Sequence, residues 1–447
     1  MNAREVAWEL LTAVDEREAY ANLEMPALLR RARLSPRDAG FATELGYGCL
    51  RMRGFVDAVL ELVLPRRIDE LDPAVLRVLE LGVYQLLVLD TEPHAAVSES
   101  VELSRRVGAA RASGFINANL RRVSERSRPQ WEMAILNRFD ELAARAALTS
   151  HPEWIVEELD VASQATTSDH DIDAVLAANN ANPAVNFVAL PGVAQDDSTR
   201  MPNRFSPVGF QAGRGDPRRV TAAPGVRVQD EGSQLAALAL SRFRAAKPGE
   251  RWLDMCAGPG GKAALLAAEA MRSGAHLLAN EVSDHRAKLV EQALLPLGAD
   301  TSVIVGDARR FADEPDSFDR ILLDAPCSGL GALRRRPEAR WRKHPDDISE
   351  LASLQTELLG AGLRALSPGG VLAYVTCSPV LRETRDVVGA VLGDDVRLLD
   401  TAEVLDGIAC EPLNARVEFA GQSGSAVQLW PHLHETDAMF IALLERT

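Results

Sequence analysis

Leu253-Asp-Met-Cys-Ala-Gly-Pro-Gly-Gly-Lys262 runs from the end of an apolar strand through a glycine-rich turn into a helix, which small residues continue over 263–271. Similar strand-like runs follow and alternate with helical patterns, for example at 285–297 and 348–366. The candidate strands are 251–255, 276–281, 301–305, 320–323, 371–376 and 439–444. Because strands that alternate with helices form a mostly parallel sheet covered on both faces, residues 226–447 are predicted to be an α/β domain.

The chain before residue 226 divides into two segments with other patterns. Residues 1–145 carry apolar side chains at helical spacing, such as Val6, Leu10 and Val14, and prolines fall between these helical segments. This pattern predicts an all-helical domain. Residues 146–225 contain helical patterns near 154–165 and 172–178, a strand near 184–190 and a loop-like stretch over 195–225. We therefore expect a multidomain protein with an all-α domain, a small α+β domain and an α/β domain.

The composition is that of an ordinary soluble globular protein, with 447 residues, 47% of them hydrophobic and 25% charged. No apolar run approaches the roughly 18 residues of a membrane span, and Glu9 and Asp15 interrupt the first apolar stretch, unlike a signal peptide. The five cysteines include no CxxC pair, which argues against a disulfide framework and against a zinc site. We expect a protein of the reducing cytoplasm with no metal.

The net charge of −15 argues against a nucleic-acid partner, although the local field decides such contacts. Locally, Leu333-Arg-Arg-Arg-Pro-Glu-Ala-Arg-Trp-Arg-Lys-His344 gathers basic residues around one tryptophan. Basic charge with an aromatic side chain suits single-stranded nucleic acid, so we expect RNA contact here rather than a solvated loop. Arginines at 30–33, 105–106 and 121–122 are interpreted either as solvated helix faces or as an RNA-contacting face.

The glycine-rich turn resembles a ligand cradle. Gly258, Gly260 and Ala263 fit a dinucleotide fingerprint, and Glu281 stands about 20 residues further on, where a ribose hydroxyl would be bound. The pattern suits NAD or the adenosine of S-adenosylmethionine, and the alternative is a tight turn without a ligand. Asp307 follows the third strand, where it would either accept a hydrogen bond from an adenine amino group or cap a helix.

Two cysteines end predicted strands. Cys327 ends Arg320-Ile-Leu-Leu-Asp-Ala-Pro-Cys327, and Cys377 ends Val371-Leu-Ala-Tyr-Val-Thr-Cys377. Since ligands of an open α/β sheet bind at the carboxyl ends of the strands, both thiols and Asp324 are expected to face one crevice. A single free cysteine is more often a small buried hydrophobe. Two at corresponding strand ends favour a site that uses a thiolate as a covalent nucleophile.

Together these strings resemble one family. Asp254-Met-Cys-Ala-Gly-Pro-Gly-Gly-Lys262, Asp324-Ala-Pro-Cys327 and Thr376-Cys377-Ser378 resemble the motifs of Sun/Nop2-type RNA cytosine-C5 methyltransferases. The front of the chain resembles the NusB-like helical domain that precedes the catalytic part in bacterial small-subunit ribosomal RNA methyltransferases. The strings that carry this second resemblance are Leu81-Gly-Val-Tyr-Gln-Leu-Leu87, His94-Ala-Ala-Val-Ser-Glu-Ser-Val101 and Gly114-Phe-Ile-Asn-Ala-Asn-Leu-Arg121. The resemblance implies an RNA-binding NusB-like domain over 1–145, an RNA-recognition-like domain over 146–225 and a Rossmann-like class I methyltransferase domain over 226–447.

The resemblance implies methyl transfer from S-adenosylmethionine to C5 of a cytidine in RNA, with small-subunit ribosomal RNA as the expected partner. Cys377 would add to C6 of cytosine, Cys327 would help to resolve the covalent adduct, and Asp324 would hold N3. The implied cofactor contacts are Cys256, Ala257, Gly258, Pro259, Gly260, Gly261, Lys262, Glu281, Asp307 and Asp324. Two of these positions depart from the family's commonest wording, because glycine replaces a frequent alanine at 258 and glutamate stands at 281 where aspartate is common.

Two other functions fit parts of the chain. An NAD(P)-dependent oxidoreductase on a Rossmann sheet would explain the glycine-rich turn and Glu281, but it leaves both strand-end cysteines and the arginine-rich run unexplained. A non-catalytic, antitermination-like RNA-binding factor would explain the helical domain alone. We expect the methyltransferase to be a monomer.

Overall fold

The computed structural model describes residues 1–168, 170–195, 197–213, 217–298 and 301–447. The chain forms two compact units, each described by itself below. The helical unit contains Met1–Glu157, Leu176–Asn182 and Leu333–Arg342. The sheet unit contains Glu158–Val175, Pro183–Ala332 and Lys343–Thr447.

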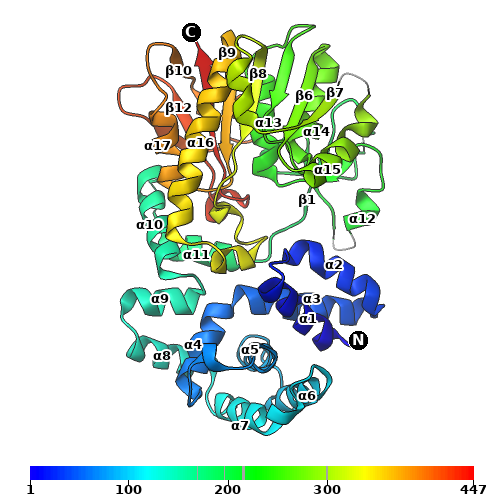
Figure 1. The fold of residues 1–447 in the computed structure, drawn as a ribbon, viewed down its shortest axis with the longest axis vertical. Coiled ribbons are helices and arrows are strands. Elements are labelled where there is room, and N and C mark those ends of the chain that lie inside the picture. Colours follow the sequence, from blue (N-terminus) through cyan, green and yellow to red (C-terminus); the bar gives the residue numbers. More distant parts are fainter. Residues whose placement is uncertain (169, 196, 214–216, 299–300) are drawn as a thin grey trace. The chain divides into compact units, whose positions relative to one another are not determined.

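Helices separated by short turns build the N-terminal part of the helical unit (Figure 1). They are α1 (Ala3–Glu16), α2 (Ala21–Ala32), α3 (Pro36–Arg51), α4 (Arg53–Val63), α5 (Pro73–Leu87), α6 (Pro93–Arg106), α7 (Ser113–Ser124), α8 (Arg128–Arg138) and α9 (Glu141–Thr149). Pro36, Pro73 and Pro93 each occupy a first helical position, where the missing N–H costs nothing. These three prolines therefore mark helix starts, whereas Pro26 lies inside α2. The predicted all-helical domain is confirmed.

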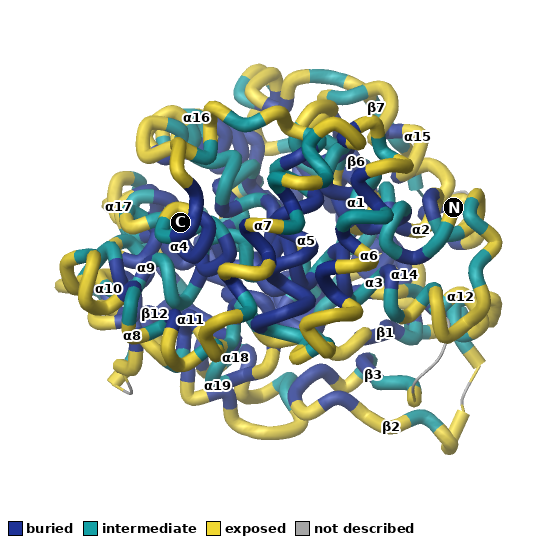
Figure 2. The backbone as a smooth tube through the Cα atoms, turned by 90° about the horizontal axis from the view of Figure 1, so that it is seen from below, coloured by how far each residue is buried: buried dark blue, intermediate teal, exposed yellow. Residues whose placement is uncertain are grey.

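Helix α5 lies at the centre of the core of the helical unit. Its residues from Val78 to Leu87 are all buried, and Figure 2 shows the helix mostly in dark blue. A helix without a polar face needs neighbours on all sides. Helices α1, α3, α4, α6 and α7 supply them.

A large sheet forms the core of the sheet unit (Figure 1), in the order β11-β12-β13-β9-β8-β5-β6-β7, with β10 paired to β13. The central strands are β5 (Arg251–Asp254), β6 (His276–Glu281), β7 (Thr301–Val305), β8 (Phe318–Asp324) and β9 (Leu366–Thr376). These five are parallel to one another, as predicted. The antiparallel edge consists of β10 (Val396–Leu398), β11 (Arg416–Glu418), β12 (Ser425–Gln428) and β13 (Phe440–Arg446).

Helices cover both faces of this sheet. Along β8, Leu322 belongs to the core shared with α13 and α14, whereas Ile321 and Leu323 belong to the core shared with α16. This alternation follows from the period of two in a strand. The helices of the sheet unit include α12 (Pro217–Val220), α13 (Glu231–Arg242), α14 (Gly261–Ser273), α15 (Asp284–Leu294), α16 (Pro345–Ala365), α17 (Arg385–Gly389), α18 (Thr401–Asp406) and α19 (Pro431–His434). Helices α10 (Glu153–Thr166) and α11 (Ile172–Asn180) match the helices predicted near 154–165 and 172–178.

The order of the large sheet reverses beside β5. The chain continues from β5 to β6 and β7 on one side, and then crosses to β8 and β9 on the other. At such a reversal the crossover helices leave in opposite directions, which opens a crevice at the carboxyl ends of the strands. The glycine-rich turn follows β5, and Asp324 to Cys327 follow β8, so both strings border this crevice.

A second, antiparallel sheet belongs to the segment between the predicted helical and α/β domains. Its order is β2-β3-β1-β4, with β1 (Asn186–Ala189), β2 (Met201–Pro202), β3 (Gly209–Gln211) and β4 (Val226–Val228). The strand expected near 184–190 is present as β1, and two other strands of this sheet, β2 and β3, lie in the stretch that was predicted to be loop. They escaped prediction because strands of two or three residues carry almost no periodicity of their own.

Candidate active site

The glycine-rich turn packs too closely for side chains. A β-carbon at position 258 would lie 2.2 Å from Oε2 of Glu281, and one at position 260 would lie 2.6 Å from Cβ of Ala293. Gly260 also has φ +106°, in the left-handed region that glycine adopts without strain. The two glycines therefore allow the chain to turn sharply between β5 and α14.

Glu281 braces this turn from the end of β6. Its side chain is 2% exposed, and Oε2 accepts a hydrogen bond of 2.9 Å from the backbone N–H of Gly258. Oε1 accepts a second bond, of 3.1 Å, from the N–H of Ser283, and Arg286 lies 3.5 Å away. Each carboxylate oxygen has a further lone pair that can accept a hydrogen bond from a ribose hydroxyl. That contact stays a prediction.

Asp307 acts as a helix cap in this structure. It precedes the 3-10 helix Ala308–Asp313, and its Oδ1 accepts a bond of 2.9 Å from the N–H of Arg309. The guanidinium of Arg309 also bonds both carboxylate oxygens, and this contact lowers the pKa of Asp307. Asp307 therefore caps a helix, which is one of its two predicted roles. Its contact to an adenine stays a prediction.

Lys262 and Asp324 form an ion pair across the crevice, with Nζ 2.8 Å from Oδ2. Burial of Lys262 lowers its pKa, but the charge of Asp324 and the hydrogen bond to it prevail, so the pKa is raised. The charge of Cys377 contributes in the same direction. Lys262 therefore remains an ammonium group that faces both a carboxylate and a cysteine sulfur.

Cys327 and Cys377 meet at the ends of β8 and β9, with 3.4 Å between their Sγ atoms. The two strands are parallel neighbours, which explains why residues 50 positions apart in sequence come together. The hydrogen bond to Cys377, followed by burial, raises the pKa of Cys327 well above its ordinary value. Cys327 is therefore a protonated thiol that can donate to the sulfur of Cys377.

Cys256 is a different kind of thiol. Burial and the nearby carboxylates of Asp254 and Asp324 raise its pKa strongly, so it is neutral and unreactive. Asp254 itself is 1% exposed, and burial followed by the charge of Asp324 raises its pKa to about 8. A predicted cofactor contact at Cys256 can involve only the backbone or the neutral thiol.

The structure places several residues of the arginine-rich run, for which RNA contact was predicted, inside the fold. Residues Leu333–Arg342 belong to the helical unit, where Arg340 is fully buried and donates to the carbonyl of Ser150 at 2.7 Å. Arg342 donates to two other backbone carbonyls, those of Val14 and Ala19. The prediction is wrong for Arg340 and Arg342 because a charge pattern cannot distinguish a solvated guanidinium from one bonded inside the fold.

The structure also brings to the site a residue that sequence reasoning missed. Glu383 lies six positions after Cys377 in the 3-10 helix Leu381–Glu383, is fully buried, and accepts hydrogen bonds from Ser328 and Ser378. An acidic residue in an irregular segment carries no periodic signal. The only hint was that a serine follows each strand-end cysteine.

The sequence predicted neither a metal site nor a membrane-spanning segment. Within the described residues, no three His, Cys, Asp or Glu side chains are grouped so that they could hold a metal ion. No helix in the described part of the chain is long and apolar enough to cross a membrane.

A doubly wound sheet with two cysteines at its carboxyl edge, preceded by a helical domain, is the architecture expected of the methyltransferases that the sequence resembles. A family model described as 16S rRNA methyltransferase RsmB/F matches residues 243–445, and a NusB family model matches residues 1–125. The ribosomal RNA small subunit methyltransferase B of Pseudomonas syringae pv. tomato is 33% identical over 90% of this chain and 89% of its own length. The chain belongs to the RsmB/F family of 16S rRNA methyltransferases.

Another relative and a solved structure are similar to nearly the whole chain. A Mycobacterium tuberculosis protein is 43% identical over 99% of this chain and 96% of its own length. The crystal structure of PH0851 matches the fold over 100% of this chain and 99% of its own, with a TM-score of 0.76 at 21% identity. The predicted family and fold class are confirmed, and a methyltransferase is favoured over the oxidoreductase and over the non-catalytic RNA-binding factor.

Proposed function

We propose that this chain transfers a methyl group from S-adenosylmethionine to C5 of a cytidine in small-subunit ribosomal RNA, through a covalent bond between Cys377 and C6. The observation that carries the proposal is the pair of sulfurs 3.4 Å apart, beside the ion pair of Lys262 and Asp324. A nucleophilic sulfur, a second thiol and a paired ammonium and carboxylate are the groups that this chemistry requires.

The turn after β5 fits the proposed cofactor. Apart from its chain neighbours and the backbone of its own helix, no described atom lies within 4 Å of the position that a β-carbon of Gly261 would take, so there is open space beside the first turn of α14. Backbone N–H groups at a helix N-terminus attract a carboxylate such as that of the methionyl group. Residues 256–262 would hold this end, and Glu281 and Asp307 would hold the nucleoside. S-adenosylmethionine, when bound, supplies an electrophilic methyl group.

The cysteine attack explains how an unreactive carbon becomes a nucleophile. When the Cys377 thiolate adds to C6, the ring loses its conjugation and C5 gains the electron density that accepts the methyl group. Asp324 would hold N3 through a hydrogen bond in which one proton lies between these two acceptors. The ammonium of Lys262 favours the thiolate form of Cys377. A base then removes the proton from C5, and the Cys377 thiolate leaves by elimination.

Cys327 is suited to the release step. Its raised pKa keeps a proton on its sulfur, within hydrogen-bonding distance of Cys377. As the bond between Cys377 and C6 breaks, that proton stabilises the charge that returns to the departing sulfur. Loss of the Cys327 thiol therefore hinders release more than attack.

Substitution of each cysteine tests this division of roles. Cys377→Ala is expected to abolish transfer of tritiated methyl groups to RNA, whereas Cys327→Ala is expected to accumulate a covalent complex of protein and RNA that survives a denaturing gel. Cys256→Ala serves as the control with an unreactive thiol and is expected to form no such complex. A Cys377→Ala protein with full activity would contradict the mechanism.

The relatives named ribosomal RNA small subunit methyltransferase B, and the NusB-like front of the chain, support the choice of RNA. The target base has to leave its stack, because C6 is attacked from the face of the ring. Bisulfite sequencing of ribosomal RNA from a deletion strain identifies the position, which is expected to regain its methyl group with the wild-type gene but not with a Cys377→Ala gene.

A further inference from the structure

Glu383 is a buried carboxylate that no step above uses. It is 0% exposed, and a carboxylate is removed from water only at a high cost unless hydrogen bonds replace the lost solvent. Four donors surround it. Oε1 accepts from the N–H of Ser328 at 2.7 Å and from Nε2 of Gln355 at 3.1 Å, and Oε2 accepts from the hydroxyls of Ser378 at 2.6 Å and Ser328 at 2.5 Å.

These donors come from the two loops that carry the cysteines. Ser328 directly follows Cys327, and Ser378 directly follows Cys377, so one carboxylate joins the residues next to both sulfurs. Gln355 of α16 strengthens the same junction, because its Nε2 also donates to the carbonyl of Pro326 at 2.9 Å. Both loops are therefore tied on their buried side to a single point.

Glu383 is itself held in place. The hydroxyl of Tyr374, on the strand that leads to Cys377, donates to the backbone carbonyl of Glu383 at 2.7 Å. Tyr374 is fully buried, so it anchors the 3-10 helix to β9. The negative charge of Glu383 also contributes to the raised pKa of Cys327, after the larger effects of Cys377 and burial.

From these contacts we propose that Glu383 is a positioning residue, which keeps Cys327 and Cys377 at reacting distance by accepting hydrogen bonds from the serine after each. The role of this distance in methyl transfer rests on the function proposed above. The distance itself is a property of the folded protein and can be measured without RNA.

The first experiment measures the geometry. Diamide oxidises two neighbouring thiols to a disulfide, taking up their two hydrogens as it becomes a hydrazine, and peptide mass spectrometry follows the pairing of Cys327 with Cys377 in the full chain. Glu383→Gln keeps the shape but loses acceptor capacity, and it is expected to slow pairing about tenfold. Ser378→Ala, which removes one donor, is expected to slow it less.

Glu231→Gln is the matched control. Glu231 is also a buried carboxylate of the sheet unit, 3% exposed, but it accepts from the N–H groups of Phe205 and Ser206. Its substitution is expected to leave the pairing rate unchanged. Equal pairing rates in Glu383→Gln and wild type would overturn the proposal.

The second experiment measures the reaction. Glu383→Gln is expected to lower kcat for methyl transfer about 10- to 100-fold while KM for S-adenosylmethionine stays within about twofold, because the cofactor residues are not displaced. An unchanged kcat would overturn the positioning role even if pairing slowed. An active Cys377→Ala protein would instead contradict the proposed mechanism, and the pairing assay would still decide whether Glu383 holds the two loops.

Discussion

At the scale of single residues, burial and close neighbours determine which groups of the site are charged. Lys262 stays charged because Asp324 is 2.8 Å away. Cys327 stays protonated because its hydrogen bond to Cys377 and its burial raise its pKa. Asp254, at the end of β5, is buried and has a pKa of about 8, so this carboxylic acid is largely neutral at neutral pH.

The raised pKa of Asp254 predicts a pH dependence of stability. An ordinary aspartate titrates at 3.8, so between about pH 4 and 8 the folded chain keeps a proton that the unfolded chain has released. Stability from this group therefore falls as pH rises through that window, by at most about 1.4 kcal/mol per pH unit. Asp254→Asn carries no such proton, and its urea midpoint is expected to fall less than that of the wild type between pH 5.5 and 7.5. Identical pH profiles for the two proteins would contradict this.

At the scale of elements, the turn between β5 and α14 is matched to the end of β6. In the family that the sequence resembles, alanine is frequent at position 258 and aspartate is common at position 281, and here both differ. A β-carbon on Gly258 would lie 2.2 Å from Oε2 of Glu281, so the longer acid fills the space that alanine would need. The two departures from the family pattern are therefore one coupled change.

This coupling predicts a rescue. Gly258→Ala alone is expected to displace Glu281, break its bond to the N–H of residue 258 and weaken binding of S-adenosylhomocysteine about tenfold, or about 1.4 kcal/mol. The double variant Gly258→Ala/Glu281→Asp is expected to recover most of that loss, since the shorter acid leaves room for the methyl group. Calorimetric titration of the two single variants and the double variant measures the coupling energy. Additive losses would show that the two positions are independent.

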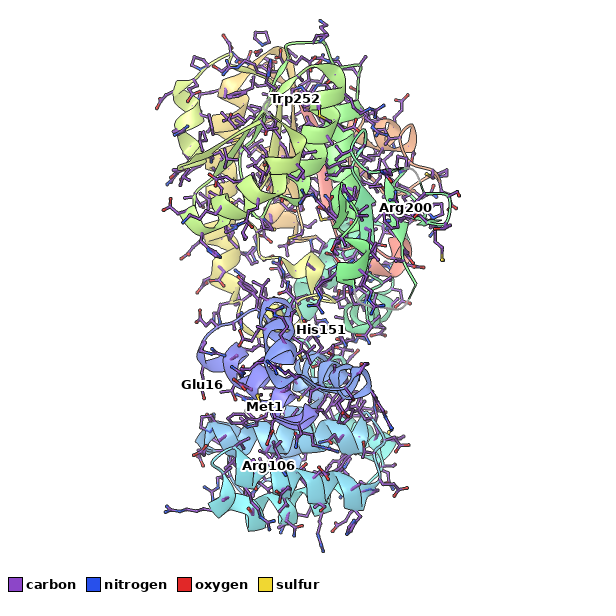
Figure 3. All side chains as sticks on the ribbon, turned by 90° about the vertical axis from the view of Figure 1, so that its right-hand side faces the viewer. Met1, Glu16, Arg106, His151, Arg200 and Trp252 are labelled. Carbon is purple, nitrogen blue, oxygen red and sulfur yellow. The ribbon has the colours of Figure 1, made fainter. Side chains whose placement is uncertain are left out.

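At the scale of the whole molecule, a distant part of the chain completes the helical unit. Arg340 donates to the carbonyl of Ser150, the C-terminal cap of α9, and to Oδ1 of Asn180 at the end of α11. A cation is favourable at helix C-termini, where carbonyls lack partners. Burial lowers the pKa of Arg340 to about 9, and burial also lowers the pKa of His151, labelled in Figure 3 and 2% exposed, so that this neighbour is neutral.

Removal of this guanidinium is expected to loosen the helical unit. Arg340→Met leaves the carbonyl of Ser150 and the amide oxygen of Asn180 without their donor, at a cost of about 2 to 3 kcal/mol. Hydrogen exchange is expected to quicken first in α9. Arg336→Met is the matched control, because Arg336 is exposed and its loss is expected to change stability by less than about 0.5 kcal/mol. Equal effects of the two substitutions would refute the capping role.

The sequence predicted those strands that contain a recognisable run of apolar residues. The strands expected at 251–255, 276–281 and 301–305 appear as β5, β6 and β7 within a residue of those bounds, because each segment contains three apolar residues within a run of strand length. Strands β10, β11 and β12 were missed because their three or four residues are defined by the partners that they pair with.

The convergence of Cys327, Cys377 and Asp324 followed from strand order alone, since parallel neighbours end at the same edge of a sheet. The hydrogen-bond partners of polar side chains could not be predicted from strand order. Glu383 joins the cysteine loops, and Arg340 is buried rather than exposed, because a hydrogen bond depends on which residues the fold brings within 3 Å. Apolar periodicity is a property of neighbouring residues in the chain, whereas burial and bonding of a charge are properties of the packed molecule.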